Sequence, residues 1–296
     1  LLDPQGKEGD QESIYDKAEK AGYKVVKTQA EAEKVSAKDE KVVIIGEKLA
    51  DSDSISYEND RASGEWALAD YVSKGIEVLS DNDKGFFMMV EGGKIDWAAH
   101  AHDGGTVVKE TIDFDQCIRL AYDFYKKHPN ETLILVTADH ETGGLGLGNS
   151  DMNLNIDLLQ YQKCSQEALT AAMREMKSGK MIPSWEDMKA FLKKNLGFWE
   201  QIKITPREEL ELLVCYEESF LKKKSKDVVS LYAKDEPLAV AAIALLDKKA
   251  SLGWTTKTHT GAPVPLYAIG KQAVLYSGRR DNTDMANVLR KLFLIK

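Results

Sequence analysis

Asp96 and His100 are residues whose types and spacing suggest metal chemistry. They are four positions apart, so on a helix they lie on one face and can bind one ion together. Glu91 precedes them at the end of an apolar segment, and its carboxylate can point into the same space. The alternative is an ordinary helix start with a hydrogen bond between Asp96 and His100, because this spacing often arises by chance.

Asp139 and His140 form a second candidate pair, directly after the strongest strand pattern of the chain, residues 131–138. Open α/β sheets bind ligands at the carboxyl ends of their strands, and an adjacent carboxylate and imidazole suit a divalent metal. The alternative is a helix-capping aspartate beside an exposed histidine. The position after an apolar strand and before Gly143 and Gly144 favours the metal.

His259 lies in a third segment, GWTTKTHTG, where a lone histidine is usually a polar loop residue. Together with the residues above it completes a set of mixed nitrogen and oxygen ligands, suited to zinc with a harder, oxygen-ligated ion nearby. The set is Glu91, Asp96, His100, Asp139, His140 and His259. His128, at a predicted helix end where its charge suits the helix dipole, and His102, off the face shared by Asp96 and His100, are weaker candidates.

The elements that must position these residues alternate between short apolar runs and helical patterns. The runs are nearly continuous in apolar residues, as in strands covered on both faces, and occupy residues 23–28, 41–46, 85–90, 131–138, 266–269 and 273–277. Helical patterns occupy residues 11–21, 64–79, 106–127 and 284–292. The alternation predicts an α/β fold with a mainly parallel central sheet flanked by helices.

Residues 149–253 lack strand patterns and are predicted to form a helical insertion. This divides the α/β core into a first part, residues 1–148, and a last part, residues 254–296. Thr205 and Glu208 form a capping box with proline in the first helical position, which predicts a helix start there. Ser184 gives a weaker start signal.

Charge and composition exclude several classes of protein. The formal net charge is −8 and no block of Lys and Arg forms a continuous track, which disfavours nucleic-acid binding. No apolar run approaches the roughly 20 residues that a transmembrane helix needs. The three cysteines, Cys117, Cys164 and Cys215, form no CxxC pair, so neither a disulfide framework nor a zinc ribbon is indicated.

Four motifs resemble those of alkaline phosphatases and follow in the order of that family: VEGGKIDWAAHAHD, VTADHETGG, GWTTKTHTG and YSGRRDNTD. The segment GYKVVKT is similar to the middle of the family's chain, so the resemblance implies a core of that fold that is incomplete at its amino-terminal side. By this resemblance the ligands of a first zinc are Asp96, His100 and His259, those of a second zinc include Asp139 and His140, and a magnesium ligand is Glu91.

The resemblance also implies the family's chemistry, the hydrolysis of phosphate monoesters through a phosphoserine at a site with two zinc ions and magnesium. The family's nucleophilic serine, in an Asp-Ser-Ala context, and its phosphate-clamping arginine have no matching motif here, and the segment 51–54 is predicted to be a loop. We expect the full-length protein to be an alkaline phosphatase and this chain alone to be inactive. Trp97 is substrate-proximal by resemblance, at a position where the family varies among Lys, His and Trp.

Two alternatives stand beside this reading: a non-catalytic zinc-binding fragment, and another hydrolase of the superfamily, such as a phosphodiesterase, a sulfatase-like enzyme or a phosphomutase. The surroundings TADHETGG and THTG favour alkaline phosphatase. The resemblance implies phosphate monoester substrates, inorganic phosphate as product, a homodimer, and a periplasmic or extracellular location. A core without its first strands would expose sheet edges and apolar surface, which predicts association with another chain.

Overall fold

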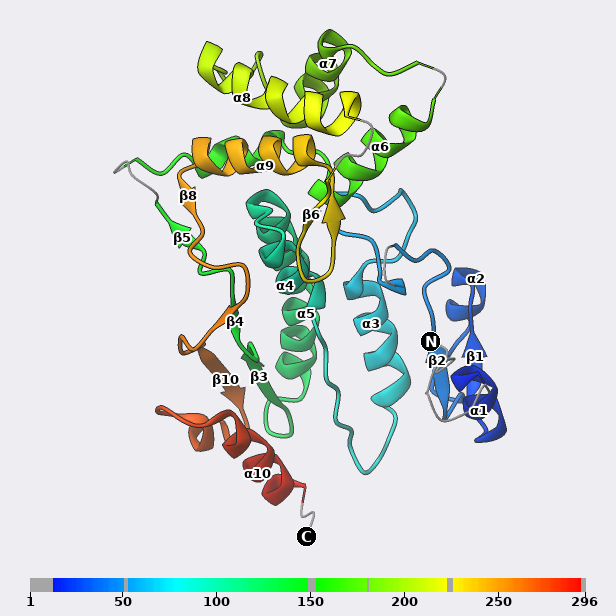
Figure 1. Cartoon of the computed structure of the whole chain (residues 1–296). Helices are drawn as coiled ribbons and strands as arrows, with labels where there is room; N and C mark the ends of the chain where they lie inside the picture. The colour runs from blue at the N-terminus through cyan, green and yellow to red at the C-terminus, as the bar shows by residue number, and fades with distance from the viewer. Residues whose placement is uncertain (1–12, 51–52, 149–152, 180, 223–225, 294–296) are drawn as a thin grey trace, which may run out of the picture. The chain divides into compact units, whose positions relative to one another are not determined.

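The computed structural model describes residues 13–50, 53–148, 153–179, 181–222 and 226–293 (Figure 1). The chain divides into two compact units. The first consists of Leu1–Gly93 and Lys109–Cys117, and the second of Lys94–Val108 and Ile118–Lys296.

The first unit is built around a short parallel strand pair. β1 (Lys24–Val26) pairs in parallel with β2 (Val42–Ile44), with Val25 opposite Val43, and α2 (Gln29–Ala32) lies in the connection between them. The helices α1 (Ile14–Lys20) and α3 (Leu68–Leu79) also belong to this unit. Val26, Ala32 and Val35 form a small core against which Val42 and Ile44 of β2 pack, as expected for a β-α-β connection that buries one face of its helix.

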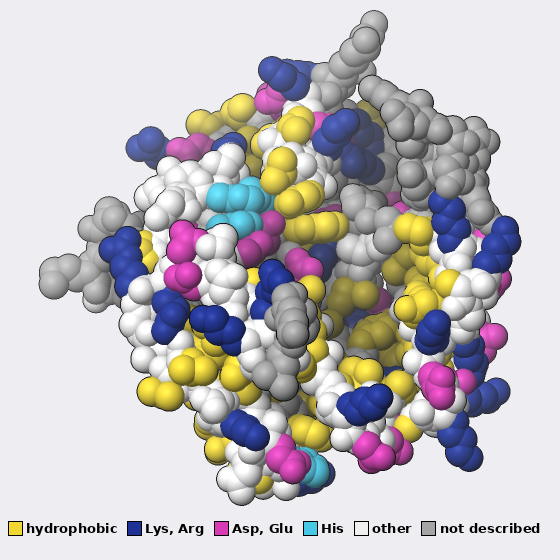
Figure 2. Space-filling model, turned by 90° about the horizontal axis from the view of Figure 1, so that it is seen from below, with side chains coloured by type: hydrophobic (Ala, Val, Ile, Leu, Met, Phe, Trp, Pro, Cys, Tyr) yellow, Lys and Arg dark blue, Asp and Glu magenta, His cyan; other side chains and the backbone are white. Residues whose placement is uncertain are grey.

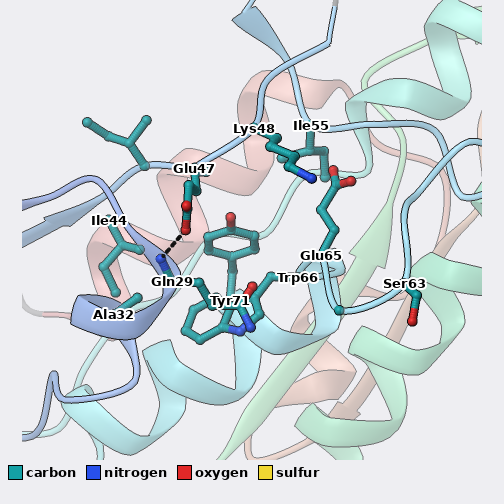
Figure 3. A pocket seen from close by; sticks show the side chains of 13 residues that line it. Gln29, Ala32, Ile44, Glu47, Lys48, Ile55, Ser63, Glu65, Trp66 and Tyr71 are labelled. Atoms are coloured by element: carbon teal, nitrogen blue, oxygen red, sulfur yellow. Dashed lines mark hydrogen bonds between the residues drawn. The ribbon is translucent and has the colours of Figure 1, made fainter.

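A cavity of about 230 Å³ opens in this unit beside the end of β2 (Figure 3). The Glu47 carboxylate accepts a hydrogen bond from the Gln29 backbone N–H at 3.1 Å, at the start of α2. The rings of Trp66 and Tyr71 meet edge to face, with centroids 5.1 Å apart. None of the six candidate metal ligands is among the residues that line this cavity.

The segments 133–147 and 252–270 of the second unit pair antiparallel to one another, which brings distant motifs together. β3 (Leu133–Thr137) pairs with β10 (Leu266–Gly270), β4 (Glu141–Thr142) with β9 (His259–Thr260), and β5 (Gly146–Leu147) with β8 (Leu252–Gly253). In the middle pair Thr142 lies opposite His259. Residues more than one hundred positions apart in the sequence therefore become neighbours.

The largest hydrophobic core lies among the helices of the second unit. Its side chains come mainly from η2 (Ile156–Tyr161), α6 (Gln166–Ser178), α7 (Trp185–Leu196), α8 (Pro206–Tyr216), the π-helical turn η3 (Glu217–Leu221) and α9 (Pro237–Lys249). Leu169, Met173, Leu192, Phe198 and Leu246 are completely buried there. Such burial of apolar surface is the main stabilising contribution to folding.

The remaining elements of the second unit lie outside this core. The short strands β6 (Val228–Val229) and β7 (Lys234–Asp235) form a hairpin. α4 (Gly93–His100) and α5 (Gly104–Lys127) precede β3, although part of each belongs to the first unit. The chain continues after β10 with the 3₁₀ helix η4 (Ala273–Tyr276) and with α10 (Asn282–Leu292).

The α/β class predicted from the sequence is confirmed. Among the described residues β1 and β2 pair in parallel and the other pairs are antiparallel. The capping boxes at Ser184 and Thr205 start α7 and α8 as predicted, because a cap depends only on residues within one turn. The helical pattern of residues 149–253 is found in the described part of that range, together with β6, β7 and β8; its status as an insertion stays a prediction.

Two predicted strands are wrong. Residues 273–276 form η4, because Gly270 and Gln272 adopt positive φ angles of 102° and 65° and turn the chain out of the extended conformation. Residues 85–90 are not assigned to a strand, since no strand of the described ranges forms a ladder with them. In the predicted loop 51–54, Asp51 and Ser52 lie outside the described residues, Asp53 is assigned to a 3₁₀ helix, and Ser54 is in neither a helix nor a strand.

None of the helices within the described ranges combines the length and the apolarity that crossing a bilayer requires.

Candidate metal centre

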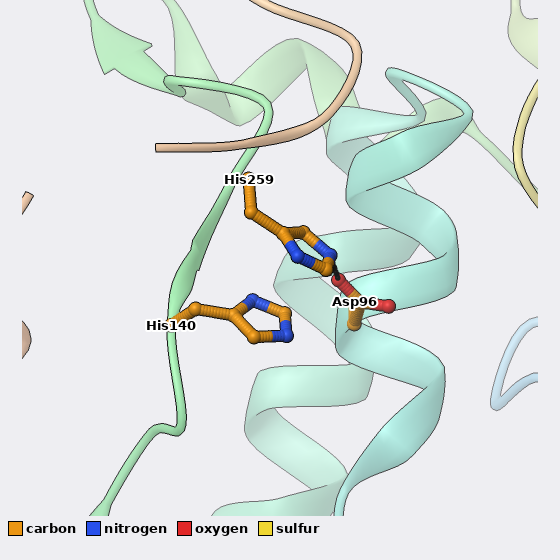
Figure 4. Close-up of side chains that lie close together, drawn as sticks. All are labelled: Asp96, His140 and His259. Carbon is orange, nitrogen blue, oxygen red and sulfur yellow. Dashed lines mark ion pairs between the residues drawn. The ribbon is translucent and has the colours of Figure 1, made fainter. Parts of the chain in front are cut away.

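Three segments of the second unit meet at a cluster of histidine and aspartate side chains (Figure 4). α4 carries Asp96 and His100 on one face, as the spacing of four residues predicts. His140 immediately precedes β4, and His259 is the first residue of β9. Since β4 and β9 pair with each other, the two histidines lie side by side and face Asp96.

The distances between the ligand atoms of Asp96, His100 and His259 suit a single zinc ion. Asp96 Oδ1 lies 3.4 Å from His100 Nε2 and 3.6 Å from His259 Nε2, and the two Nε2 atoms are 3.0 Å apart. A tetrahedral zinc with bonds of about 2.0–2.1 Å separates its ligand atoms by about 3.3 Å. The three atoms are thus spaced as ligands of one ion would be.

His100 is oriented by a backbone carbonyl. Its Nδ1 lies 2.9 Å from the carbonyl oxygen of Lys257, and because a carbonyl only accepts, Nδ1 carries the proton. Nε2 then presents its lone pair to Asp96 and His259. A hydrogen bond of this kind to the second ring nitrogen is the usual way in which proteins orient a metal-binding histidine. The side chain of His100 is fully buried, which holds this orientation.

His140 lies beside His259 in the cluster, and the side chains of both are partly exposed. Its ring stacks on that of His259, with centroids 3.5 Å apart, and one potential ligand atom from each of Asp96, His140 and His259 lies within 4.8 Å of the others. Asp139 is largely exposed, with a carboxylate oxygen 3.2 Å from His140 Nε2. In the space-filling view, histidine side chains lie together at the surface beside acidic side chains (Figure 2). The cluster is therefore accessible from solvent.

Thr142 connects the two sides of the cluster. Its hydroxyl donates to Asp96 Oδ1 at 2.5 Å and lies 3.2 Å from His140 Nδ1. The sequence analysis did not single out Thr142. Its place in the motif VTADHETGG, two residues after His140, is a signal that could have indicated it.

Glu91 belongs to the first unit, whereas the cluster belongs to the second. Its role as a magnesium ligand therefore stays a prediction from the sequence.

Trp97 lies on α4 next to Asp96, and its ring stacks on Tyr232 with centroids 4.8 Å apart. Tyr232 comes from the loop between β6 and β7 and also meets the His100 ring edge to face, at 5.4 Å. The Lys94 ammonium group lies 4.6 Å from the centre of the Trp97 ring, a distance at which a cation is attracted to the ring. Sequence reasoning missed Tyr232, since nothing in its surroundings marks a contact with α4.

Two buried carboxyl groups meet at the start of α5: Asp103 is its N-cap residue, and Asp247 reaches it from α9. Asp103 accepts hydrogen bonds from the backbone N–H groups of Thr106 and Gln166. Asp247 accepts from the backbone N–H of Gly104. Burial raises the pKa of both carboxyl groups, and raises that of Asp247 to about 7, with a further contribution from the charge of Asp103.

Because the pKa of Asp247 is raised, the free energy of unfolding should depend on pH through this group. An Asp247→Asn variant should lack this dependence. The folded carboxyl retains a proton that the unfolded one releases above its ordinary pKa of 3.8, so this group lowers the stability as the pH rises from about 4 to 7. We expect Asp247→Asn to be more stable than the wild type at pH 8, by on the order of 2–4 kcal/mol. The difference should shrink toward pH 4. Urea unfolding of both proteins over this pH range measures it, and parallel pH profiles would contradict the shift.

Comparison with known proteins gives one consistent result. A family model described as alkaline phosphatase matches residues 2–295. Alkaline phosphatase 4 of Bacillus subtilis (strain 168) is 32% identical over 273 residues, which cover 92% of this chain and 52% of that protein. The chain thus spans about half the length of this curated relative.

Solved structures agree in fold. The cold-active alkaline phosphatase from the psychrophile Shewanella sp. aligns with a TM-score of 0.75 at 25% identity, over 95% of this chain and 62% of that one. The Thermus thermophilus alkaline phosphatase aligns with a TM-score of 0.68 at 22% identity, over 97% of this chain and 59% of that one. The second similarity concerns the fold alone.

Proposed function

The chain belongs to the alkaline phosphatase family, and we propose that it contributes a complete zinc site and part of a second one to a phosphate monoesterase. The observation that carries this proposal is the convergence of Asp96, His100 and His259. Their ligand atoms lie 3.0–3.6 Å apart, although His259 is more than 150 positions from Asp96 and His100 in the sequence.

The chemistry of these three residues fits zinc better than a harder cation. Two imidazole nitrogens and one carboxylate oxygen match the ligands that zinc accepts, whereas magnesium prefers oxygen ligands alone. Three protein ligands leave a fourth tetrahedral position open, which is typical of catalytic zinc sites. A zinc ion held here would supply Lewis-acid polarisation of a phosphate oxygen.

Asp139 and His140 would contribute to the second zinc. They lie next to the first site, where His140 stacks on His259. Two-metal hydrolases place their ions about 3.5–4 Å apart, so ligands of the second ion must lie beside those of the first. Glu91 would help to bind magnesium, and Trp97 would lie close to the substrate.

For the full-length protein we propose hydrolysis of phosphate monoesters to inorganic phosphate through a phosphoserine intermediate. The serine nucleophile and the phosphate-clamping arginine would lie outside these residues. The family resemblance also supports a homodimer and a periplasmic or extracellular location as proposals. This chain alone would then bind zinc without catalysing hydrolysis.

The proposal is tested by assaying the purified chain with an aryl phosphate, zinc and magnesium at alkaline pH, and by measuring its zinc content. We expect tightly bound zinc and no phosphate release above that of a His259→Ala control. Turnover above this control would mean that the nucleophile lies within these residues. A wild-type chain that retains no zinc would contradict the first zinc site.

The substrate class is tested separately on the full-length protein. We expect faster hydrolysis of phosphate monoesters than of phosphate diesters or sulfate esters. The reverse order would instead support a phosphodiesterase or a sulfatase-like enzyme.

A further inference from the structure

Trp254 lies where the three segments of the metal centre meet. Its ring stacks on His102 in parallel, with centroids 4.7 Å apart and an angle of 6° between the planes. It also lies against Gly143, since a Cβ built at that glycine would be 2.8 Å from two carbons of the indole. A side chain at position 143 would therefore collide with the indole. The φ of Gly143 is 80°, a backbone conformation that also favours glycine.

Each of these contacts is close in sequence to a histidine of the cluster. His102 follows His100 by two residues, Gly143 follows His140 by three, and Trp254 precedes His259 by five. The indole therefore contacts the segments that carry His100 and His140, and it belongs to the segment that carries His259.

Hydrogen bonds to backbone groups connect the same segments around the indole. His102 Nε2 donates to the carbonyl oxygen of Thr256 at 2.6 Å. The Gly143 carbonyl accepts from the backbone N–H groups of Thr255 and Thr256 at 3.1 and 3.2 Å. The Gly143 N–H donates to the carbonyl of Thr258 at 3.1 Å, one residue before His259. A displacement of the indole would thus be transmitted to the backbone that carries His259.

Asp247 fixes the orientation of the indole. The Trp254 Nε1–H donates to Asp247 Oδ2 at 2.7 Å, and the same oxygen accepts from the Gly104 N–H at 3.2 Å. Asp247 lies near the end of α9 and is 2% exposed. Its carboxyl group therefore connects the helical core to the start of α5 and to the indole through a single oxygen.

We propose that Trp254, oriented by Asp247, is a positioning residue that sets the spacing of His100, His140 and His259. The inference rests on the proposed zinc site and adds the residues that hold its ligands in place. Trp254 is only partly buried and is not among the side chains of the helical core. Removing its ring should loosen the three segments while the helical core stays folded.

The test compares zinc affinity in five proteins by competition with a chelator. We expect the zinc dissociation constant to rise about 10–100-fold in Trp254→Ala, as for other residues that orient metal ligands. Trp254→Phe, which keeps a stacking ring but loses the N–H, should lie between this variant and the wild type. Asp247→Asn, whose amide oxygen can accept both hydrogen bonds, should bind zinc within about twofold of the wild type.

Leu192→Ala is the control for a purely structural effect. It opens a cavity in the helical core, at a residue that is completely buried, and should lower stability without changing zinc affinity. The positioning role would be refuted if Trp254→Ala bound zinc as tightly as the wild type, or if Leu192→Ala weakened zinc binding equally. If the wild-type chain itself bound no zinc, the proposed zinc site would fail instead.

Discussion

Replacing His259 by alanine is expected to weaken zinc binding by the chain more than about 100-fold. His259 brings a ligand atom from β9 to the two on α4, since its Nε2 lies 3.0 Å from His100 Nε2 and 3.6 Å from Asp96 Oδ1. Losing a residue that only orients a ligand costs about 10–100-fold in metal affinity, so the loss of a ligand itself should cost more. Chelator competition with zinc measures the change.

His128→Ala is the matched control for this variant. His128 lies at the end of α5, where its ring packs on Phe124 with centroids 4.6 Å apart. The same substitution there should leave the zinc affinity unchanged. Equal affinities for His259→Ala and the wild type would show that zinc binds elsewhere on the chain.

The second large effect concerns the helical core, where Leu192→Ala should destabilise the chain by about 2–5 kcal/mol. Leu192 lies on α7 and is completely buried among the other side chains of this core. Removing its outer carbons costs the transfer free energy of the lost atoms and leaves a cavity that the neighbouring helices fill only in part. Urea unfolding followed by helical circular dichroism measures the change.

Leu210→Ala makes the same chemical change at an exposed position. Leu210 lies on α8 and is 60% exposed, so its loss should change the stability by no more than about 0.5 kcal/mol. If the two variants were equally stable, the core would not be packed as described.

Local features of the fold were predictable from the sequence because a few neighbouring residues decide them. The capping boxes at Ser184 and Thr205 start α7 and α8. Asp96 and His100 share one face of a short helix, because a spacing of four residues corresponds to about one helical turn. The failure at residues 273–277 has a local cause too, since apolar composition does not reveal the left-handed conformation of Gln272 that precedes η4.

Long-range features were less accessible. The sequence placed His140 and His259 in one set of candidate ligands, but their contact depends on the pairing of β4 with β9, which are two residues long. Strands this short leave no periodic pattern to read. Tyr232 against Trp97, and Trp254 between His102 and Gly143, were likewise not predictable, because these contacts join segments more than 100 residues apart.

X-ray absorption at the zinc edge tests the central claim most directly, on the chain loaded with one equivalent of zinc. A site made by Asp96, His100 and His259 predicts nitrogen and oxygen ligands at about 2.0–2.1 Å, with the scattering of two imidazole rings. The His259→Ala variant should lose one of these rings. Sulfur ligands at about 2.3 Å, or a spectrum that His259→Ala leaves unchanged, would contradict the account.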